Sequence, residues 1–127
     1  MTGRQCFWYN SNMPTDKRKR VYEAIIREHL AENRQMVLLS GSRQCGKTTL
    51  AESIGTDYLN WDDADVRSAI VAGQSETVRR YALDKLASAA RIVVFDELLK
   101  YPRWESYLKE FFDVHGRAMK IIATGSV

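Results

Sequence analysis

Four short stretches of the chain are rich in apolar residues and predict buried strands. They cover residues 35–40, 57–61, 92–95 and 119–124. Polar residues and segments with helical spacing of apolar positions separate them. Apolar strands that alternate with helices are typical of a parallel sheet covered by helices on both faces. The pattern therefore predicts an α/β fold with three layers, α/β/α, around a parallel sheet.

The segments between these strands carry apolar residues at the spacing of amphipathic helices. The first helix is expected to begin near Thr15 or Asp16, directly after Pro14. Its inward face would consist of Tyr22, Ile25, Ile26, His29 and Leu30. Residues 1–15 show no clear period, so we treat them as an N-terminal segment that precedes a core spanning residues 16–127.

Capping residues mark the ends of the later helices. An aspartate at position 62 or 63 can cap a helix that Gly73 closes, and Ser75 can cap the helix that follows. Pro102 suits the start of the last helix, and Gly116 its end. The apolar face of that helix would consist of Trp104, Tyr107, Leu108, Phe111 and Phe112.

The loop after the first apolar stretch matches the phosphate-binding motif G-x-x-x-x-G-K-[ST], the P-loop. Its glycines let backbone N–H groups turn toward phosphate oxygens, where a side chain would collide. Lys47 would reach the β- and γ-phosphates, and the hydroxyl of Thr48 would bind Mg²⁺. The helix over residues 49–54 would point its N-terminus at the phosphates. The expected nucleotide-binding residues are Gly41, Ser42, Arg43, Gln44, Cys45, Gly46, Lys47, Thr48 and Thr49.

Two acidic residues, Asp96 and Glu97, directly follow the apolar stretch 92–95. Asp96 would hold Mg²⁺ through its water shell, and Glu97 would orient and deprotonate an attacking water. A water-activating glutamate favours hydrolysis over transfer to an acceptor, because kinases must exclude water. The guanine-reading motif N-K-x-D is absent from the sequence, which favours ATP over GTP.

The last apolar stretch ends in Thr124, Gly125 and Ser126. In P-loop ATPases with an Asp-Glu pair, another strand lies between the P-loop strand and the acidic strand, and residues 119–124 suit that doubly covered position. A hydroxyl at its carboxyl end would lie between the γ-phosphate and the attacking water. Thr124 is therefore the predicted catalytic sensor, with Ser126 as the alternative. A plain turn at the strand end is the competing interpretation.

Composition adds limits rather than a function. The 127 residues, 45% hydrophobic and 28% charged, suit one globular domain with a mildly basic net charge of +3. The basic run at residues 17–20 lacks interleaved aromatic residues, which favours a solvated helical turn over a nucleic-acid patch. Cys6 and Cys45 do not form a disulfide framework, and no apolar run has the length of a membrane span. We therefore expect a cytoplasmic protein.

Four blocks of sequence together resemble the predicted AAA+ superfamily ATPases of bacteria and archaea that usually carry a C-terminal domain of unknown function. The blocks are GSRQCGKTT at 41–49, YLNWD at 58–62, DELLKYPRW at 96–104 and KIIATGS at 120–126. The resemblance covers about residues 16–127. It implies an AAA+ core with strand order 5-1-4-3-2 and with ATP and Mg²⁺ as ligands. It also implies the roles given above for Lys47, Thr48, Asp96, Glu97 and Thr124.

The chain departs from that family in two respects. Ser42 and Cys45 stand where the family usually has proline and valine, changes that the loop should tolerate. The family's fifth strand, arginine finger, helical lid and C-terminal domain would all lie beyond Val127. We therefore expect four strands in the order 1-4-3-2 with the fifth strand missing. Residues 36–39 would then form an uncovered edge, open to self-association or to a partner chain.

Three functional hypotheses follow. The first is an ATP-binding protein that hydrolyses ATP with Mg²⁺, with impaired turnover because the missing parts would supply charge to the transition state. The second is an ATP-dependent switch or binding module with negligible turnover. The third and least favoured is a small-molecule kinase. His29 and His115 are more typical of helix-face residues than of metal ligands.

Overall fold

The fold is built on one parallel sheet. The computed structural model describes residues 4–8, 15–32, 36–41, 47–85 and 91–126. Five strands of this part of the chain pair in the order β1-β2-β5-β4-β3. Their bounds are β1 (Arg4–Trp8), β2 (Met36–Gly41), β3 (Asp57–Asn60), β4 (Arg91–Asp96) and β5 (Met119–Ser126). Four of them match the predicted apolar stretches, and their predicted order, 1-4-3-2 in that numbering, is confirmed.

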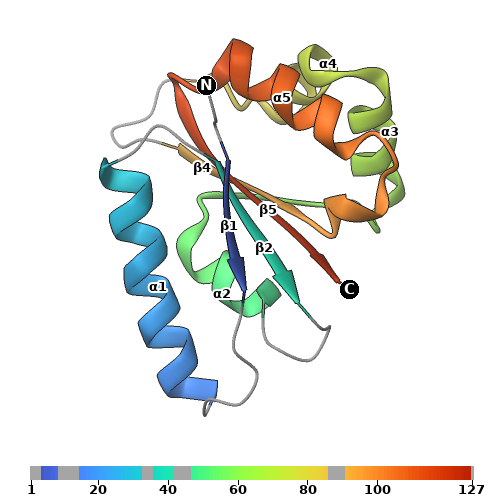
Figure 1. The fold of residues 1–127 in the computed structure, drawn as a ribbon. Coiled ribbons are helices and arrows are strands. Elements are labelled where there is room, and N and C mark those ends of the chain that lie inside the picture. The colour runs from blue at the N-terminus through green and yellow to red at the C-terminus, as the bar shows by residue number, and fades with distance from the viewer. Residues whose placement is uncertain (1–3, 9–14, 33–35, 42–46, 86–90, 127) are drawn as a thin grey trace.

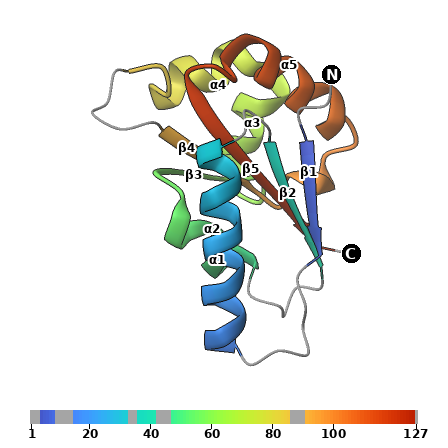
Figure 2. The same ribbon diagram turned by 60° about the vertical axis from the view of Figure 1, so that its left-hand side comes forward.

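Helices cover both faces of the sheet, as Figures 1 and 2 show. One face carries α1 (Thr15–Glu32) and α2 (Lys47–Ile54). The opposite face carries α3 (Ala64–Ala72), α4 (Gln74–Tyr81), the short 3₁₀ helix η2 (Leu98–Lys100) and α5 (Trp104–His115). The predicted three-layer α/β/α architecture is therefore confirmed. Among the described helices, none has the length and apolar character needed to cross a membrane.

Side chains alternate between two cores along each central strand. Val94 of β4 and Ile122 of β5 pack against α1 and α2. Their neighbours Phe95 and Ala123 pack on the other side, among the side chains of α3, α4 and α5. This alternation follows from the pleat, because successive side chains of a strand point to opposite faces. It also fixes which side chains share a face at the carboxyl ends of the strands.

The expectation of an uncovered edge at residues 36–39 is wrong. The parallel strand β1 pairs with β2, so that Arg4 lies opposite Met36 and Trp8 opposite Ser40. The backbone N–H and C=O groups on that side of β2 therefore have a partner within the chain, which removes the reason for self-association there. The N-terminal segment, which has no clear apolar period, contributes this fifth strand.

Most helix ends match the predictions. Asp63 caps α3, accepting a hydrogen bond from the backbone N–H of Asp65, and Gly73 ends it. The expected cap at Ser75 is wrong, because α4 begins at Gln74 with Gly73 before it and has no side-chain cap. Gly73 has φ 122°, a conformation that favours glycine, which lets the chain turn at once from α3 into α4.

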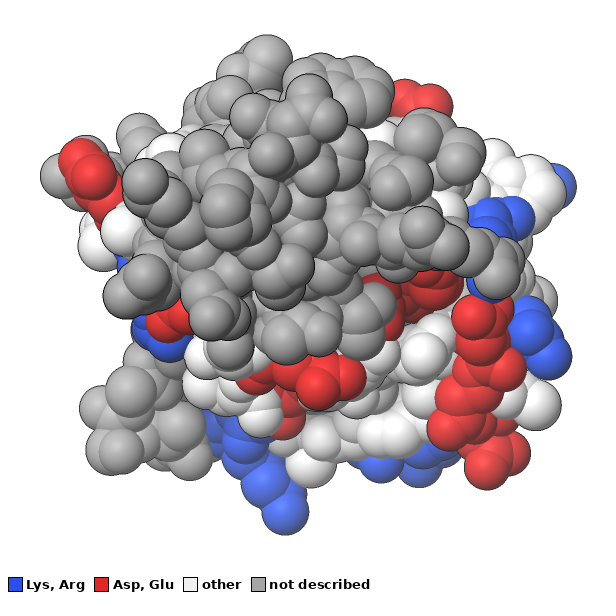
Figure 3. Space-filling view, turned by 90° about the horizontal axis from the view of Figure 1, so that it is seen from below, with Lys and Arg blue, Asp and Glu red and all other residues white. Residues whose placement is uncertain are grey.

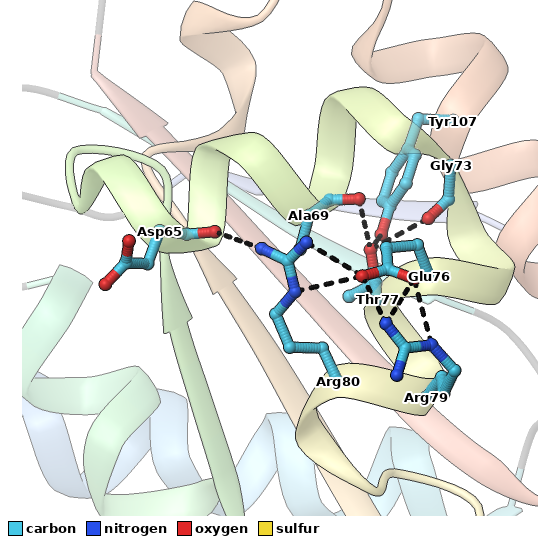
Figure 4. A network of polar contacts seen from close by, with 8 residues as sticks. All are labelled: Asp65, Ala69, Gly73, Glu76, Thr77, Arg79, Arg80 and Tyr107. Atoms are coloured by element: carbon cyan, nitrogen blue, oxygen red, sulfur yellow. Dashed lines mark hydrogen bonds and ion pairs between the residues drawn. The ribbon is translucent and has the colours of Figure 1, made fainter.

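A buried hydroxyl cluster joins α3 and α4 to α5 (Figure 4). The Thr77 hydroxyl lies 3.1 Å from the carbonyl oxygen of Ala69 and 3.0 Å from that of Gly73. It also accepts a 2.8 Å hydrogen bond from the Tyr107 hydroxyl. Thr77 is fully buried. Every polar atom of this cluster has a partner within it, as the interior of a protein requires.

Candidate functional site

The carboxyl ends of the strands meet at one edge of the sheet, toward which the arrowheads of β2 and β5 point in Figure 1. In parallel α/β folds, ligands bind at this edge. Figure 3 views the molecule from that direction, with acidic side chains at the middle and along one side of the described surface. Asp96 ends β4, and Thr124 and Ser126 lie at the end of β5, so the predicted acidic and hydroxyl residues come together here.

Asp96 is enclosed at the end of β4. It is 2% exposed, and its neighbour on β5, Thr124, is fully buried. The Thr124 hydroxyl donates a short hydrogen bond to Oδ1 of Asp96, and the Tyr58 hydroxyl, from β3, donates a short one to Oδ2. Strands on both sides therefore orient one carboxylate. Burial, followed by the hydrogen bond to Asp96, raises the pKa of Tyr58 above its ordinary value.

Glu97 has a backbone conformation that is rare for its residue type. Its φ of 59° and ψ of 22° lie in the left-handed region, which costs a residue with a Cβ about 1–2 kcal/mol. The Glu97 N–H donates a 3.0 Å hydrogen bond to the Thr124 hydroxyl, which helps hold the turn. Such strain tends to persist at functional positions.

The side chain of Glu97 is also held in place. Its Oε1 accepts a 3.0 Å hydrogen bond from the Ser126 hydroxyl. Its Oε2 is buried and accepts no hydrogen bond among the described residues; the Lys100 ammonium lies 3.6 Å away. One carboxylate oxygen is thus anchored, and the other keeps its capacity to accept a proton or a hydrogen bond.

Lys100 connects the ends of two strands. Its ammonium lies 2.8 Å from Oδ1 of Asp62, which follows β3, and 3.6 Å from Oε2 of Glu97. Asp62 is half exposed, so this pair contributes little to stability. Its effect is local, because it sets positive charge beside the Glu97 carboxylate.

Gly125 explains how the turn after β4 packs so closely on β5. A Cβ at this position would lie 2.4 Å from Cβ of Leu99, a distance that atoms cannot share. Because Gly125 has no side chain, η2 can pack closely against β5, which brings Glu97 next to Ser126. The predicted Thr-Gly-Ser segment therefore forms the end of β5 rather than a turn, and it lies beside Glu97.

The predicted P-loop falls largely outside the described residues. Ser42, Arg43, Gln44, Cys45 and Gly46 lie outside the described residues. Gly41 ends β2 and is the register partner of Ser126. Lys47, Thr48 and Thr49 form the first residues of α2, and only their backbone is described. Strand β2 thus ends beside the strand end that carries Thr124 and Ser126.

Sequence reasoning did not find Tyr58 or Lys100. Both lie in blocks that it singled out, but their roles depend on which strands are neighbours and in what register. Asn60 lies opposite Asp96 in the register of β3 and β4. Tyr58, two residues earlier, therefore shares a face with Asp96, a fact that only the strand order reveals.

Neither His29 nor His115 is one of the residues gathered at the strand ends. Burial, and then the charge of Lys120, lowers the pKa of His29. His115 pairs with Gln74, at 2.6 Å between ring and amide. Among the described residues, no group of three or more His, Cys, Asp or Glu is arranged to hold a metal ion. A cation bound chiefly by phosphates and water, as Mg²⁺ commonly is, does not need such a group.

Comparison with known proteins agrees with this arrangement. The family model described as an AAA domain matches residues 33–127, from just before β2 to the end of β5. No curated protein and no solved structure matched the chain. The matched region contains the P-loop motif, the acidic strand end and the hydroxyl strand end. The chain therefore belongs to the AAA-domain family of P-loop nucleoside triphosphatases.

Proposed function

We propose that the protein binds ATP with Mg²⁺ and hydrolyses it. The observation that carries this proposal is the state of Glu97. Its side chain is anchored through Oε1 by Ser126, and its buried Oε2 accepts no hydrogen bond among the described residues. A carboxylate held in this way, after β4 and separated from the P-loop strand β2 by β5, suits a general base that takes a proton from water.

The residues present fit a nucleotide bound with Mg²⁺. Carboxylate and hydroxyl oxygens are the ligands that this cation prefers, and Asp96 supplies a carboxylate with both oxygens oriented by hydroxyls. When bound, Mg²⁺ would supply positive charge beside the phosphates of the nucleotide.

Each residue then has one task. Lys47 binds the β- and γ-phosphates, and Thr48 with Asp96 holds the metal and its water shell. Glu97 orients the attacking water and accepts its proton at Oε2. Thr124 fixes the turn that presents Glu97, since its hydroxyl contacts both the Asp96 carboxylate and the Glu97 N–H.

Calorimetric titration of the wild-type chain and the Lys47→Ala variant with ATP and Mg²⁺ tests nucleotide binding. We expect the variant to bind at least about tenfold more weakly, because a charge-assisted contact to phosphate contributes roughly 1.5–3 kcal/mol. Lys109→Ala is the matched control, since Lys109 is exposed on α5 and pairs only loosely with Asp113 at 3.4 Å. Equal ATP affinity in wild type and Lys47→Ala would show that the P-loop assignment is wrong.

Phosphate release, measured with and without added acceptors, then separates the three hypotheses. Release without an acceptor supports the ATPase. Binding without release points to a switch, and release that needs an acceptor points to a kinase. Parallel titrations with GTP and ADP test the preference for ATP.

A further inference from the structure

Three side chains from adjacent strands share one face at the carboxyl end of the sheet. Strand β4 lies between β3 and β5. Val94 faces α1 and α2, and Phe95 faces the opposite core, so Asp96 returns to the α1/α2 face. The same alternation places Thr124 there, two residues after Ile122, and Tyr58 there, next to Leu59, which faces the opposite core. This is the face on which α2 begins after the P-loop.

The hydroxyls of Thr124 and Tyr58 contact different oxygens of the Asp96 carboxylate. Thr124 donates to Oδ1, and Tyr58 donates to Oδ2. One contact alone would let the carboxylate pivot about its bonded oxygen, whereas two contacts on different oxygens fix its plane. An ionised carboxylate has about four acceptor sites, so two hydroxyls orient it without exhausting its capacity for further donors.

The two donors differ in exposure. Thr124 is fully buried, whereas Tyr58, on the outer strand β3, is 36% exposed. The Tyr58 hydroxyl donates to the Asp96 carboxylate from β3, on the side of β4 opposite Thr124. Tyr58 belongs to neither of the two buried cores. Packing therefore does not account for this side chain, whereas its hydrogen bond to Asp96 orients a carboxylate.

We propose that Tyr58 is a positioning residue for the nucleotide's metal ion, because its hydroxyl, together with that of Thr124, aims the Asp96 carboxylate at the metal-bound water. The inference rests on the function proposed above, in which Asp96 holds Mg²⁺ through water. Tyr58 acts through Asp96 and does not itself touch nucleotide or metal.

The test measures how strongly Mg²⁺ promotes ATP binding. For each variant, the ATP dissociation constant is determined by calorimetry in excess EDTA and in excess Mg²⁺, and their ratio is the metal coupling. We expect Tyr58→Phe to reduce this ratio by about tenfold, the lower end of the effect of losing an outer-shell partner of a metal site. The dissociation constant in EDTA should not change, because the phosphate contacts are untouched.

Two further variants show whether the effect is specific. Tyr107→Phe also removes one tyrosine hydroxyl, but on the opposite face of the sheet, where it bonds Thr77. It should lower stability and leave the metal coupling unchanged. In an Asp96→Asn background, adding Tyr58→Phe should have no further effect on the coupling, because the two residues act in series. Circular dichroism establishes that each variant is folded.

The outcomes separate this inference from the function on which it rests. No ATP binding by the wild type, or a wild-type coupling ratio of one, contradicts the proposed function. Clear wild-type coupling that Tyr58→Phe leaves intact overturns the positioning role alone. In the Asp96→Asn background, a further loss of coupling on adding Tyr58→Phe would show that Tyr58 acts independently of Asp96 and would also overturn the positioning role.

Discussion

Two buried hydroxyl clusters in this molecule look alike but differ in what they leave open. One joins α3 and α4 to α5 through Thr77 and Tyr107, and the other lies at the strand ends around Asp96 and Thr124. Thr77, Asp96 and Thr124 are all almost fully buried. The Thr77 cluster contains only neutral groups, and each has a partner within the cluster. The strand-end cluster surrounds a carboxylate and leads to Glu97, whose Oε2 accepts no hydrogen bond among the described residues.

This difference separates a structural cluster from a candidate site. In the Thr77 cluster every buried polar group is hydrogen-bonded within the cluster, as a protein interior requires, so the cluster needs no further ligand. The Asp96 carboxylate instead lies at the strand ends, in the place where α/β folds bind ligands.

The largest expected effect is on turnover, at the open cluster. Glu97→Gln keeps the size of the side chain and its ability to accept from Ser126 but removes the base. We expect ATP hydrolysis to fall by at least about a hundredfold, the scale of general-base loss, while ATP binding with Mg²⁺ persists. Phosphate release and calorimetric titration of the same preparation measure the two quantities.

Glu110→Gln is the control for this variant, because Glu110 is an exposed residue of α5. It should hydrolyse ATP at the wild-type rate. Weaker ATP binding with unchanged turnover in Glu97→Gln would instead give Glu97 a structural role.

The sequence predicts the central part of the fold well, because continuous apolar stretches mark its strands. The apolar stretches 35–40, 92–95 and 119–124 correspond to β2, β4 and β5, each buried on both faces. A strand in that position must be apolar throughout, which makes it easy to recognise. Asp96 ends β4 and Glu97 follows it directly, so their place at the strand end is also predictable.

Features that depend on pairing are not predictable in this way. Within the described part of the chain, β1 is a short edge strand that pairs only with β2, and such a strand needs no continuous apolar run. The contact between Tyr58 and Asp96 depends on the register of β3 and β4, which no local pattern encodes. The start of α4 at Gln74 instead of Ser75 follows from the tight Gly73 turn after α3, a tertiary constraint on a local signal.

The next effect is on stability, at the closed cluster. Thr77→Val keeps the shape of the side chain but leaves the Tyr107 hydroxyl without its acceptor. We expect the free energy of unfolding in urea to fall by about 1–3 kcal/mol, the cost of one unsatisfied buried polar group. ATP affinity should not change, because the cluster lies on the face opposite Asp96.

A double-mutant cycle sharpens this prediction. Adding Tyr107→Phe removes the stranded hydroxyl, so the double variant should be less destabilised than the sum of the two single variants. Strictly additive losses would mean that the Thr77–Tyr107 bond contributes nothing. A loss of ATP affinity in a stable Thr77→Val variant would contradict the separation of the two clusters.

The smallest expected effect concerns His115, which belongs to neither cluster. Its ring is partly exposed and is paired with Gln74. Burial lowers the pKa of His115, opposed by the charge of Asp84. Below pH 6.5, the unfolded chain therefore binds more protons than the folded chain, so stability is lost as the pH falls toward the folded pKa. Because solvent screens a partly exposed ring, we expect a loss of only a few tenths of a kcal/mol between about pH 7 and pH 5. His115→Gln should flatten the dependence of the unfolding free energy on pH in that window, which urea denaturation at several pH values measures.

His29 contributes in the same direction, so the single variant should reduce the slope and a variant with both histidines replaced should reduce it further. Identical slopes in wild type and His115→Gln would show that the imidazole is hydrated as fully in the folded chain as in the unfolded one.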